Sequence, residues 1–248
     1  RGHSPHLDAL AERGVLAAWM EPAYPSLTFP NHYTLVTGLR PDRHGIIDNT
    51  MSDPELGGFW LSNREAVGDG RWWSAGEPVW NTAQAHGLRT ATMFWPGSEA
   101  DIDGRRPDHW HPYDGSLGKD ERVGQLLEWL DLPADRRPHF MTLYFEHVDS
   151  VGHGVGPADP RVDVAVREVD AALGRLLEGL RVRGLEDRVN LVVVSDHGMA
   201  ATSPGRVVFV EDVLPAGSAS IVSIGSALGL NPREGRTAEL EAAMLCRH

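Results

Sequence analysis

Amphipathic helical patterns alternate with short apolar runs along most of this chain, and this alternation constrains the fold more than any other feature. The clearest helical pattern spans residues 161–182, where apolar side chains recur about every 3.6 residues opposite a polar face. It leads into an apolar run at 189–195. This order predicts a doubly wound, mostly parallel α/β sheet with right-handed crossovers and helices on both faces. Earlier units with the same order are predicted at 77–86 and 89–94, and at 119–131 and 139–149.

The N-terminal part is predicted to be less regular. A helix is expected over 4–13 with Ser4 as its N-cap, followed by a strand at 15–20. A second helix is expected from Pro30 to Thr37. Residues 40–76 carry many Gly, Asp, Asn and Trp residues with little periodicity, which is typical of a long excursion over a functional site rather than of a core element.

Composition excludes several classes of protein. A chain of 248 residues with 41% hydrophobic content can bury one large core, so a single domain is expected. The net charge of −12 argues against a protein that wraps a nucleic-acid polymer, although bound cations could still attract a small anionic substrate. Cys246 is the only cysteine, which excludes an intrachain disulfide and a multi-cysteine metal site. No segment approaches the roughly 20 apolar residues that a membrane span requires.

Aromatic residues and the end of the chain allow two further predictions. Most of the eight Trp residues lie between 60 and 129 and are expected to be core and cover residues rather than the lining of an aromatic substrate pocket. A helix is expected over 237–246, where the helical pattern of apolar residues is cut off before it is complete.

Two acidic-histidine clusters close two of the apolar runs. Asp149 and His153 follow the run at 139–149, and Asp196 and His197 follow the run at 189–195. Carboxylates and imidazoles are ligands of catalytic zinc, and the ligand crevice of an open α/β sheet lies beyond the carboxyl ends of its strands. A glycine between Asp149 and His153 would let the chain turn so that both side chains face one ion.

Each cluster also has a simpler interpretation. An Asp after a strand is often a helix cap, and a His nearby is often a surface residue. Asp196 and His197 are adjacent, so on a strand they would point to opposite sides and could reach two different ions about 3.5 to 4 Å apart.

Thr28 is the candidate nucleophile. It stands just before the helix that Pro30 opens, where first-turn amides can stabilise a phosphate, and a base or metal would have to remove its proton. The alternative is an ordinary N-cap. Asn49 could donate its amide to a developing negative charge or could simply occupy a turn. Phe29 and Tyr144 are placed to grip a flat base.

His32 and His44 are interpreted as structural residues or as neighbours of the ligands, rather than as ligands themselves.

These motifs occur in a familiar order. The segments are Thr-Phe-Pro-Asn-His-Tyr, Gly-Leu-Arg-Pro-Asp-Arg-His-Gly-Ile, Asp-Ser-Val-Gly-His and Val-Val-Ser-Asp-His-Gly-Met. Over nearly the whole chain they closely resemble the nucleotide pyrophosphatase/phosphodiesterase family of the alkaline phosphatase superfamily, bacterial members in particular. The resemblance implies a two-zinc phosphodiesterase in which Thr28 attacks phosphorus, a nucleoside or alcohol leaves, and water hydrolyses the threonyl-phosphate.

The resemblance also implies roles for individual residues. Asp149 and His153 would hold one zinc, and Asp196, His197 and the Thr28 oxygen would hold the other. Asn49 would bind a non-bridging phosphate oxygen. Two substrate-binding positions, Phe29 and Tyr144, would stack a nucleotide base.

Two further metal donors of the family, an Asp ahead of Arg1 and a His beyond residue 248, are not in this sequence. Residues 1–248 are therefore expected to be a single phosphodiesterase catalytic domain that lacks the first strand and the C-terminal part, with impaired metal binding. Because family members are generally exported, a periplasmic or secreted parent is expected.

Other functions stay open. A phosphonate hydrolase or phosphomonoesterase of the same superfamily would share the metal shell, whereas a sulfatase is disfavoured because the segment after Thr28 lacks the Arg of the sulfatase motif. A catalytically silent domain that binds nucleotides weakly is an alternative of a different class.

Overall fold

A three-stranded parallel sheet lies at the centre of the computed structural model, which describes residues 2–245. Its strand order is β4 (His109–Trp110), β3 (Thr90–Met93) and β5 (Phe140–Leu143). Both neighbours run parallel to β3, which is buried along its whole length. A strand buried on both sides agrees with the predicted α/β architecture, in which helices cover the two faces.

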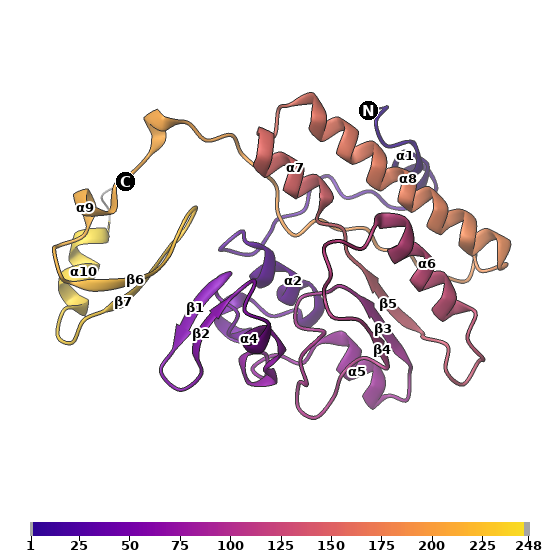
Figure 1. The fold of residues 1–248 in the computed structure, drawn as a ribbon, viewed down its shortest axis with the longest axis horizontal. Coiled ribbons are helices and arrows are strands. Elements are labelled where there is room, and N and C mark those ends of the chain that lie inside the picture. Colours follow the sequence, from indigo (N-terminus) through magenta and orange to yellow (C-terminus); the bar gives the residue numbers. More distant parts are fainter. Residues whose placement is uncertain (1, 246–248) are drawn as a thin grey trace.

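Successive side chains of the sheet enter two different cores. Met141 and Leu143 of β5 pack with the helices α6 (Lys119–Leu130) and α8 (Pro160–Val182), whereas Phe140 packs into the other core. This alternation follows from the two-residue period of a strand. The helix α5 (Val79–Ala85) lies on the side of the sheet opposite α8 (Figure 1). The predicted helices at 77–86, 119–131 and 161–182 are thus confirmed, with shifts of a few residues at their ends.

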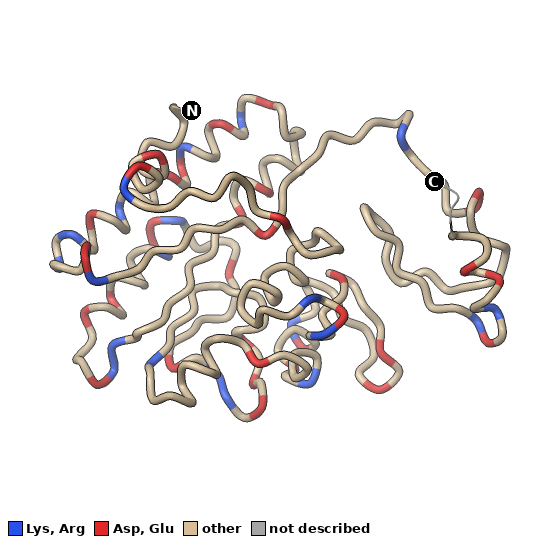
Figure 2. Tube along the Cα trace, turned by 180° about the vertical axis from the view of Figure 1, so that it is seen from behind, with Lys and Arg blue, Asp and Glu red and all other residues tan. Residues whose placement is uncertain are grey.

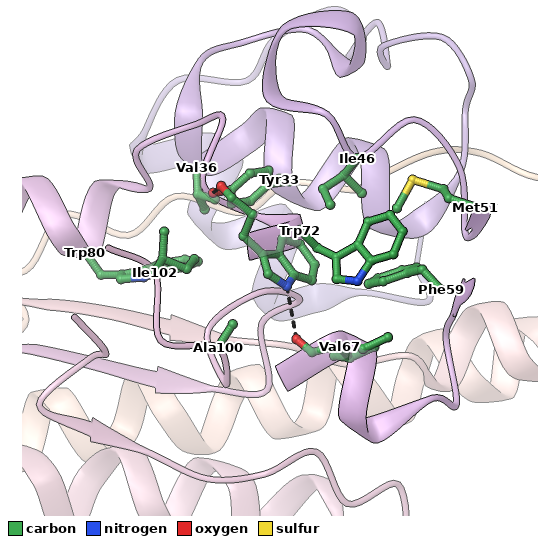
Figure 3. Packing of buried hydrophobic residues seen from close by; sticks show 12 residues of the cluster. Tyr33, Val36, Ile46, Met51, Phe59, Val67, Trp72, Trp80, Ala100 and Ile102 are labelled. Atoms are coloured by element: carbon green, nitrogen blue, oxygen red, sulfur yellow. Dashed lines mark hydrogen bonds between the residues drawn. The ribbon is translucent and has the colours of Figure 1, made fainter. Parts of the chain in front are cut away.

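Residues 40–76 form much of the second core, which contradicts the prediction that they cross the surface as a long excursion. This stretch contains α3 (Pro41–His44), the hairpin of β1 (Thr50–Asp53) and β2 (Gly57–Trp60), α4 (Arg64–Gly68) and a 3-10 turn at Gly70–Trp72. Its apolar residues pack on α2 (Thr28–Thr37) instead of crossing the surface (Figure 3). Trp73 is fully buried, and its indole Nε1 donates to the carbonyl of Val67 at 3.0 Å. Trp72 and Trp73 are core residues, as predicted, whereas Trp60 is 47% exposed.

Two predicted strands are wrong. Residues 15–20 and 189–195 are extended but make no ladder hydrogen bonds with other described strands. Their apolar side chains remain in solvent, and Val15 and Val192 are 100% and 80% exposed. An apolar run favours an extended backbone, but a strand also requires a neighbouring edge that pairs with its N–H and C=O groups.

The C-terminal elements stand apart from the central sheet and lie beside β1 (Figure 1). They comprise a 3-10 turn at Pro204–Arg206, α9 (Val210–Val213), β6 (Ala219–Ile224), β7 (Leu228–Pro232) and α10 (Thr237–Met244). The Ser223 hydroxyl donates to Asp48 Oδ2 at 3.0 Å. The Asn231 amide donates to Ser52 Oγ at 2.8 Å. The predicted helix at 237–246 is confirmed through Met244, and Cys246 lies outside the described residues.

Charged residues are spread over the whole molecule. In Figure 2 acidic and basic positions alternate along the chain, and the basic ones do not form a continuous face. None of the helices described between residues 2 and 245 is both long and apolar enough to cross a bilayer.

The helix α1 (Pro5–Arg13) is capped by a residue far away in the sequence. Ser4 occupies the N-cap position, as predicted, but its side chain makes no capping bond. Instead, the buried carboxylate of Asp170 on α8 accepts the N–H groups of His6 at 3.1 Å and Leu7 at 2.9 Å. Amides at a helix start have no partner within the helix, so Asp170 both satisfies them and attaches α1 to α8.

Asp170→Ala should lower the free energy of unfolding by about 1–3 kcal/mol, because two partly buried amides at the start of α1 lose their acceptor. Chemical denaturation measures this loss. Asp163→Ala on the exposed face of the same helix is the control and should change stability by less than about 0.5 kcal/mol. Equal effects of the two substitutions would contradict the capping role of Asp170.

His44 makes stability depend on pH. It is 0% exposed, its Nδ1 accepts the Ile46 N–H at 3.2 Å, and its Nε2 lies 3.0 Å from Thr34 Oγ1. Burial lowers the pKa of His44 to about 4. Below about pH 6.5 the unfolded chain therefore binds a proton at His44 that the folded protein does not take up until about pH 4.

Between these pH values the free energy of unfolding should fall, by about 2–3 kcal/mol at pH 4 for this one residue. Denaturation curves from pH 7 to 4 measure the effect, with His44→Gln as the comparison because Gln cannot gain a proton. The wild type should lose more stability than H44Q across this window. Parallel curves for the two proteins would show that His44 is not the cause.

Candidate active site

Thr28 is the first residue of α2, and a polar clamp fixes the loop before it. Leu27 is the N-cap of this helix and makes no side-chain capping bond. Asn31, which is 2% exposed, accepts the Ala23 N–H at 2.7 Å and donates to the carbonyls of Ala23, Pro25 and Leu27. A buried amide satisfied in this way holds the backbone in one conformation. The Thr28 side chain is thus positioned without being used as a cap.

The hydroxyl of Thr28 faces His197, although 169 positions separate the two residues. Thr28 Oγ1 lies 3.4 Å from His197 Nε2, which in turn lies 3.2 Å from Asp196 Oδ2. Asp196 and His197 therefore converge on one point. This contradicts the expectation that they point to opposite sides, which assumed a strand at 189–195.

The other ring nitrogen of His197 has a backbone partner. Nδ1 lies 2.9 Å from the carbonyl oxygen of Gly198. In the tautomer with hydrogen on Nδ1, this bond leaves an unprotonated Nε2 directed at Thr28 Oγ1 and Asp196. A His that binds a metal has the same arrangement, with one nitrogen donating to a carbonyl and the other free to coordinate.

His32, also on α2, contacts both Thr28 and Asp196. Its Nδ1 is 2.7 Å from the Thr28 carbonyl oxygen and 3.5 Å from Asp196 Oδ2. Burial lowers the pKa of His32, although the Asp196 carboxylate acts in the opposite direction. The imidazole also makes edge contacts with the rings of Trp95 and Tyr144, each at 4.9 Å between ring centroids. These contacts agree with its interpretation as a supporting residue.

Asp149 and His153 lie on a helix rather than at a strand end. The strand β5 ends at Leu143, and both residues belong to α7 (His147–Val155). The predicted sharp turn between them is wrong: four residues of helix place both side chains on one face. Asp149 Oδ1 and His153 Nε2 are 3.4 Å apart and partly open to solvent. Glu146 is the N-cap of α7, so Asp149 is not its cap.

Asn49 and Tyr144 approach the start of α2 through the neighbours of Thr28, Asn49 through the Phe29 backbone and Tyr144 through the His32 ring. The Asn49 side-chain oxygen accepts the Phe29 N–H at 2.9 Å, which directs the Asn49 NH₂ group away from that bond. The Phe29 ring packs on Phe59 and Trp73 of the core. Burial raises the pKa of the Tyr144 phenol above its usual range, and the charges of Asp196, Glu146 and Asp149 add to this rise. Both acidic-histidine clusters therefore act electrostatically on Tyr144.

The donor separations fit zinc. Tetrahedral zinc with bonds of about 2.0–2.1 Å places neighbouring ligand atoms about 3.3–3.4 Å apart. The distances between the donor atoms are 3.4 Å for Thr28 and His197, 3.2 Å for Asp196 and His197, and 3.4 Å for Asp149 and His153. Across residues 2–245 no group of three or more His, Cys, Asp or Glu side chains clusters as a metal site. The described donors form two pairs, Asp149 with His153 and Asp196 with His197. The Thr28 hydroxyl lies beside the second pair as a further donor.

A buried ion pair that the sequence analysis missed supports this region. Arg122 on α6 is 3% exposed in its side chain and contacts both carboxylate oxygens of Glu146, at 2.6 and 2.9 Å. It also donates to the carbonyl of Tyr144 at 3.0 Å. Arg122 thereby fixes the link between β5 and α7. The helical pattern at 119–131 did not reveal it, because an Arg on a helix is usually exposed.

Comparisons with known proteins agree with these observations. An uncharacterized pyrophosphatase/phosphodiesterase of Schizosaccharomyces pombe is 42% identical over 86% of this chain and 44% of its own length. Human ectonucleotide pyrophosphatase/phosphodiesterase family member 1 is 42% identical over 94% of this chain and 25% of its own length. The chain thus spans less than half the length of these curated relatives.

A solved structure shares the fold. It is an inactive threonine-to-alanine variant of murine ectonucleotide pyrophosphatase/phosphodiesterase 5 in complex with AMP, and it superposes with a TM-score of 0.90 at 32% identity. The match covers 99% of this chain and 65% of the murine chain. The predicted alkaline phosphatase-like α/β fold is confirmed. The sequence model of the type I phosphodiesterase / nucleotide pyrophosphatase family matches residues 1–245, and this chain therefore belongs to that family.

Proposed function

We propose that this protein hydrolyses nucleotide phosphodiester or pyrophosphate bonds through a threonyl-phosphate intermediate on Thr28. The observation that carries the proposal is the 3.4 Å approach of Thr28 Oγ1 to His197 Nε2 at the start of α2. A threonine hydroxyl is a weak nucleophile unless a neighbouring group or ion lowers the pKa of its proton. Thr28 lies beside such a group and is free of a capping bond.

Two zinc ions are the proposed cofactors. Asp149 and His153 would hold one, and Asp196, His197 and the Thr28 oxygen would hold the other. When bound, the ions would lower the pKa of the attacking oxygen and stabilise the charge on the leaving oxygen. The donor separations and the Gly198 partner of His197 support this assignment.

The remaining roles follow from the chain's own groups. The Thr28 oxygen attacks phosphorus as the bond from phosphorus to the leaving oxygen breaks, and the leaving group departs with the proton of Thr28, as a nucleoside or alcohol from a phosphodiester and as a phosphate or nucleotide from a pyrophosphate. Water then cleaves the threonyl-phosphate and returns the proton to Thr28. The Asn49 NH₂ group would donate to a non-bridging oxygen, because its carbonyl oxygen is held by the Phe29 N–H.

The proposed substrates are small nucleotides. Phe29 follows Thr28 directly, Tyr144 packs on His32 of the same helix, both rings are partly exposed and would offer surface to a base, and the murine relative binds AMP. The relatives named as ectonucleotide enzymes support a periplasmic or secreted location for the whole protein.

The test uses two nitrophenyl substrates. The protein should release p-nitrophenol from the p-nitrophenyl ester of thymidine monophosphate with zinc present, and a chelator should stop this release. Simple p-nitrophenyl phosphate should react much more slowly. A preference for the simple phosphate would identify a phosphomonoesterase, and a preference for a phosphonate ester a phosphonate hydrolase.

Metal content is tested separately. Because each proposed ion has only two Asp or His donors among residues 2–245, elemental analysis of the purified 248-residue chain should find fewer than two tightly held zinc equivalents. Two tightly held equivalents would refute impaired metal binding. If the chain hydrolyses none of these esters and calorimetry finds nucleotide binding that is indifferent to zinc, it is a silent nucleotide-binding domain instead.

A further inference from the structure

A contact between Gly152 and Met199 lies between the two donor pairs. Gly152 is the buried residue of α7, and it follows Asp149 by three positions and precedes His153 by one. Residues three positions apart are neighbours on a helix surface, so Gly152 lies beside Asp149, while His153 is the next residue along the chain and is exposed. Met199 comes two residues after His197.

Any side chain at position 152 would have to displace Met199. A Cβ atom at position 152 would lie 2.6 Å from Met199 Sδ and 3.1 Å from Met199 Cε. The thioether therefore rests directly on the α7 backbone, where the chain that follows residue 195 passes beside this helix (Figure 1). Residues 197–203 belong to no helix or strand, so side-chain contacts such as this one must hold them in place.

We propose that Gly152 and Met199 form a spacer that sets the distance between the Asp149/His153 pair and the Asp196/His197 pair. Gly152 is then a positioning residue for hydrolysis, and this inference rests on the proposed function. Each donor pair is built locally, since Asp149 and His153 share one helix and Asp196 and His197 are adjacent. The Asp196/His197 pair contacts α2 through Thr28 and His32. The contact between Gly152 and Met199 is where the segment after His197 meets α7, the helix of the other pair.

Gly152→Ala should lower catalytic activity without lowering stability. Alanine favours a helix by about 1 kcal/mol over glycine, and the flexible Met199 side chain can move aside, so the melting temperature should stay equal or rise. Displacing Met199 should shift one donor pair against the other, and misplacement of about 1 Å can lower kcat as much as about 100-fold. With zinc present, calorimetry should find AMP bound about tenfold more weakly, because its phosphate would be held from both sides.

The matched control is Gly154→Ala on the same helix. A Cβ atom there would meet nothing within 4 Å, so G154A should leave kcat and AMP affinity unchanged. Met199→Val removes the sulfur and the methyl group that would meet the new Cβ atom. M199V alone should lower kcat because the contact is lost, whereas G152A/M199V should be more active than G152A. M199V would then lower kcat in the wild type but raise it in G152A. If the two substitutions acted independently, M199V would lower kcat in both.

The outcomes are distinguishable. Rescue in the double variant with unchanged melting temperatures supports the spacer. Wild-type kcat and AMP affinity in G152A, or a double variant as impaired as G152A, overturns the spacer while the proposed function stands. If the wild type neither hydrolyses the nitrophenyl ester nor binds AMP with zinc present, the proposed function fails, and the positioning role of Gly152 fails with it.

Discussion

Thr28→Ala should lower kcat for the nitrophenyl ester of thymidine monophosphate by at least about a thousandfold, because removing a nucleophile removes the covalent route. The substitution should barely alter the fold. The clamp that fixes this segment uses the Asn31 side chain and backbone carbonyls, and the Thr28 hydroxyl takes no part in it. Thermal unfolding and AMP affinity should therefore stay close to those of the wild type, so that the loss is confined to kcat.

Two further variants define the role of the hydroxyl. Thr28→Ser keeps an oxygen at the same position and should retain measurable turnover. Thr37→Ala lies on the same helix, where its hydroxyl donates to the carbonyl of Tyr33, and it should leave kcat unchanged. If T28A hydrolyses the ester at more than about a tenth of the wild-type rate, the nucleophile is another group, and the proposed intermediate is wrong.

Arg122→Met should produce the largest loss of stability, about 3–5 kcal/mol, because it leaves the partly buried Glu146 carboxylate without its partner. Burial acts to raise the pKa of Glu146, but the hydrogen bonds and charge of Arg122, with a backbone hydrogen bond and the charge of His147, together hold that pKa below its usual value. Arg122 also donates to the carbonyls of Leu117 and Tyr144, which would lose a donor. Urea denaturation at pH 7 measures the free energy of unfolding.

The comparison is the double variant R122M/E146L. Replacing both charges with apolar side chains leaves no unpaired carboxylate, so the double variant should be more stable than R122M alone. Lowering the pH should also reduce the deficit of R122M relative to the wild type, because a protonated Glu146 no longer needs a cationic partner. A loss below about 1 kcal/mol in R122M would mean that this ion pair contributes no more than an exposed one.

Periodicity predicted the helices well and the strands only partly. The pattern at 161–182 defined α8 to within a residue, because a long amphipathic helix encodes its buried face locally. The run at 189–195 has an equally clear apolar pattern but pairs with no described strand, and pairing depends on distant residues. Residues 40–76 were mistaken for a surface excursion because Phe59 enters the core from a four-residue strand and Trp72 and Trp73 from a 3-10 turn and the residue after it, elements too short to show a period.

The candidate site was predictable in its residue types but not in its geometry. Motif order associated Thr28 with Asp196 and His197, and the structure places His197 beside Thr28. The helical setting of Asp149 was missed because a short strand and a following helix share one apolar stretch. The Met199 contact could not be foreseen, since a glycine in a sequence does not reveal which distant side chain rests on it.

The hydrogen bond between Ser223 and Asp48 gives the last hairpin an influence on phosphate recognition. Asp48 precedes Asn49, whose side chain we propose to grip the substrate, and its other carboxylate oxygen accepts the N–H of Thr50. The loop that presents Asn49 is thus braced from a position 175 residues further along the chain. A change at Ser223 in β6 can therefore loosen the loop that carries Asn49 without touching any of the proposed metal donors.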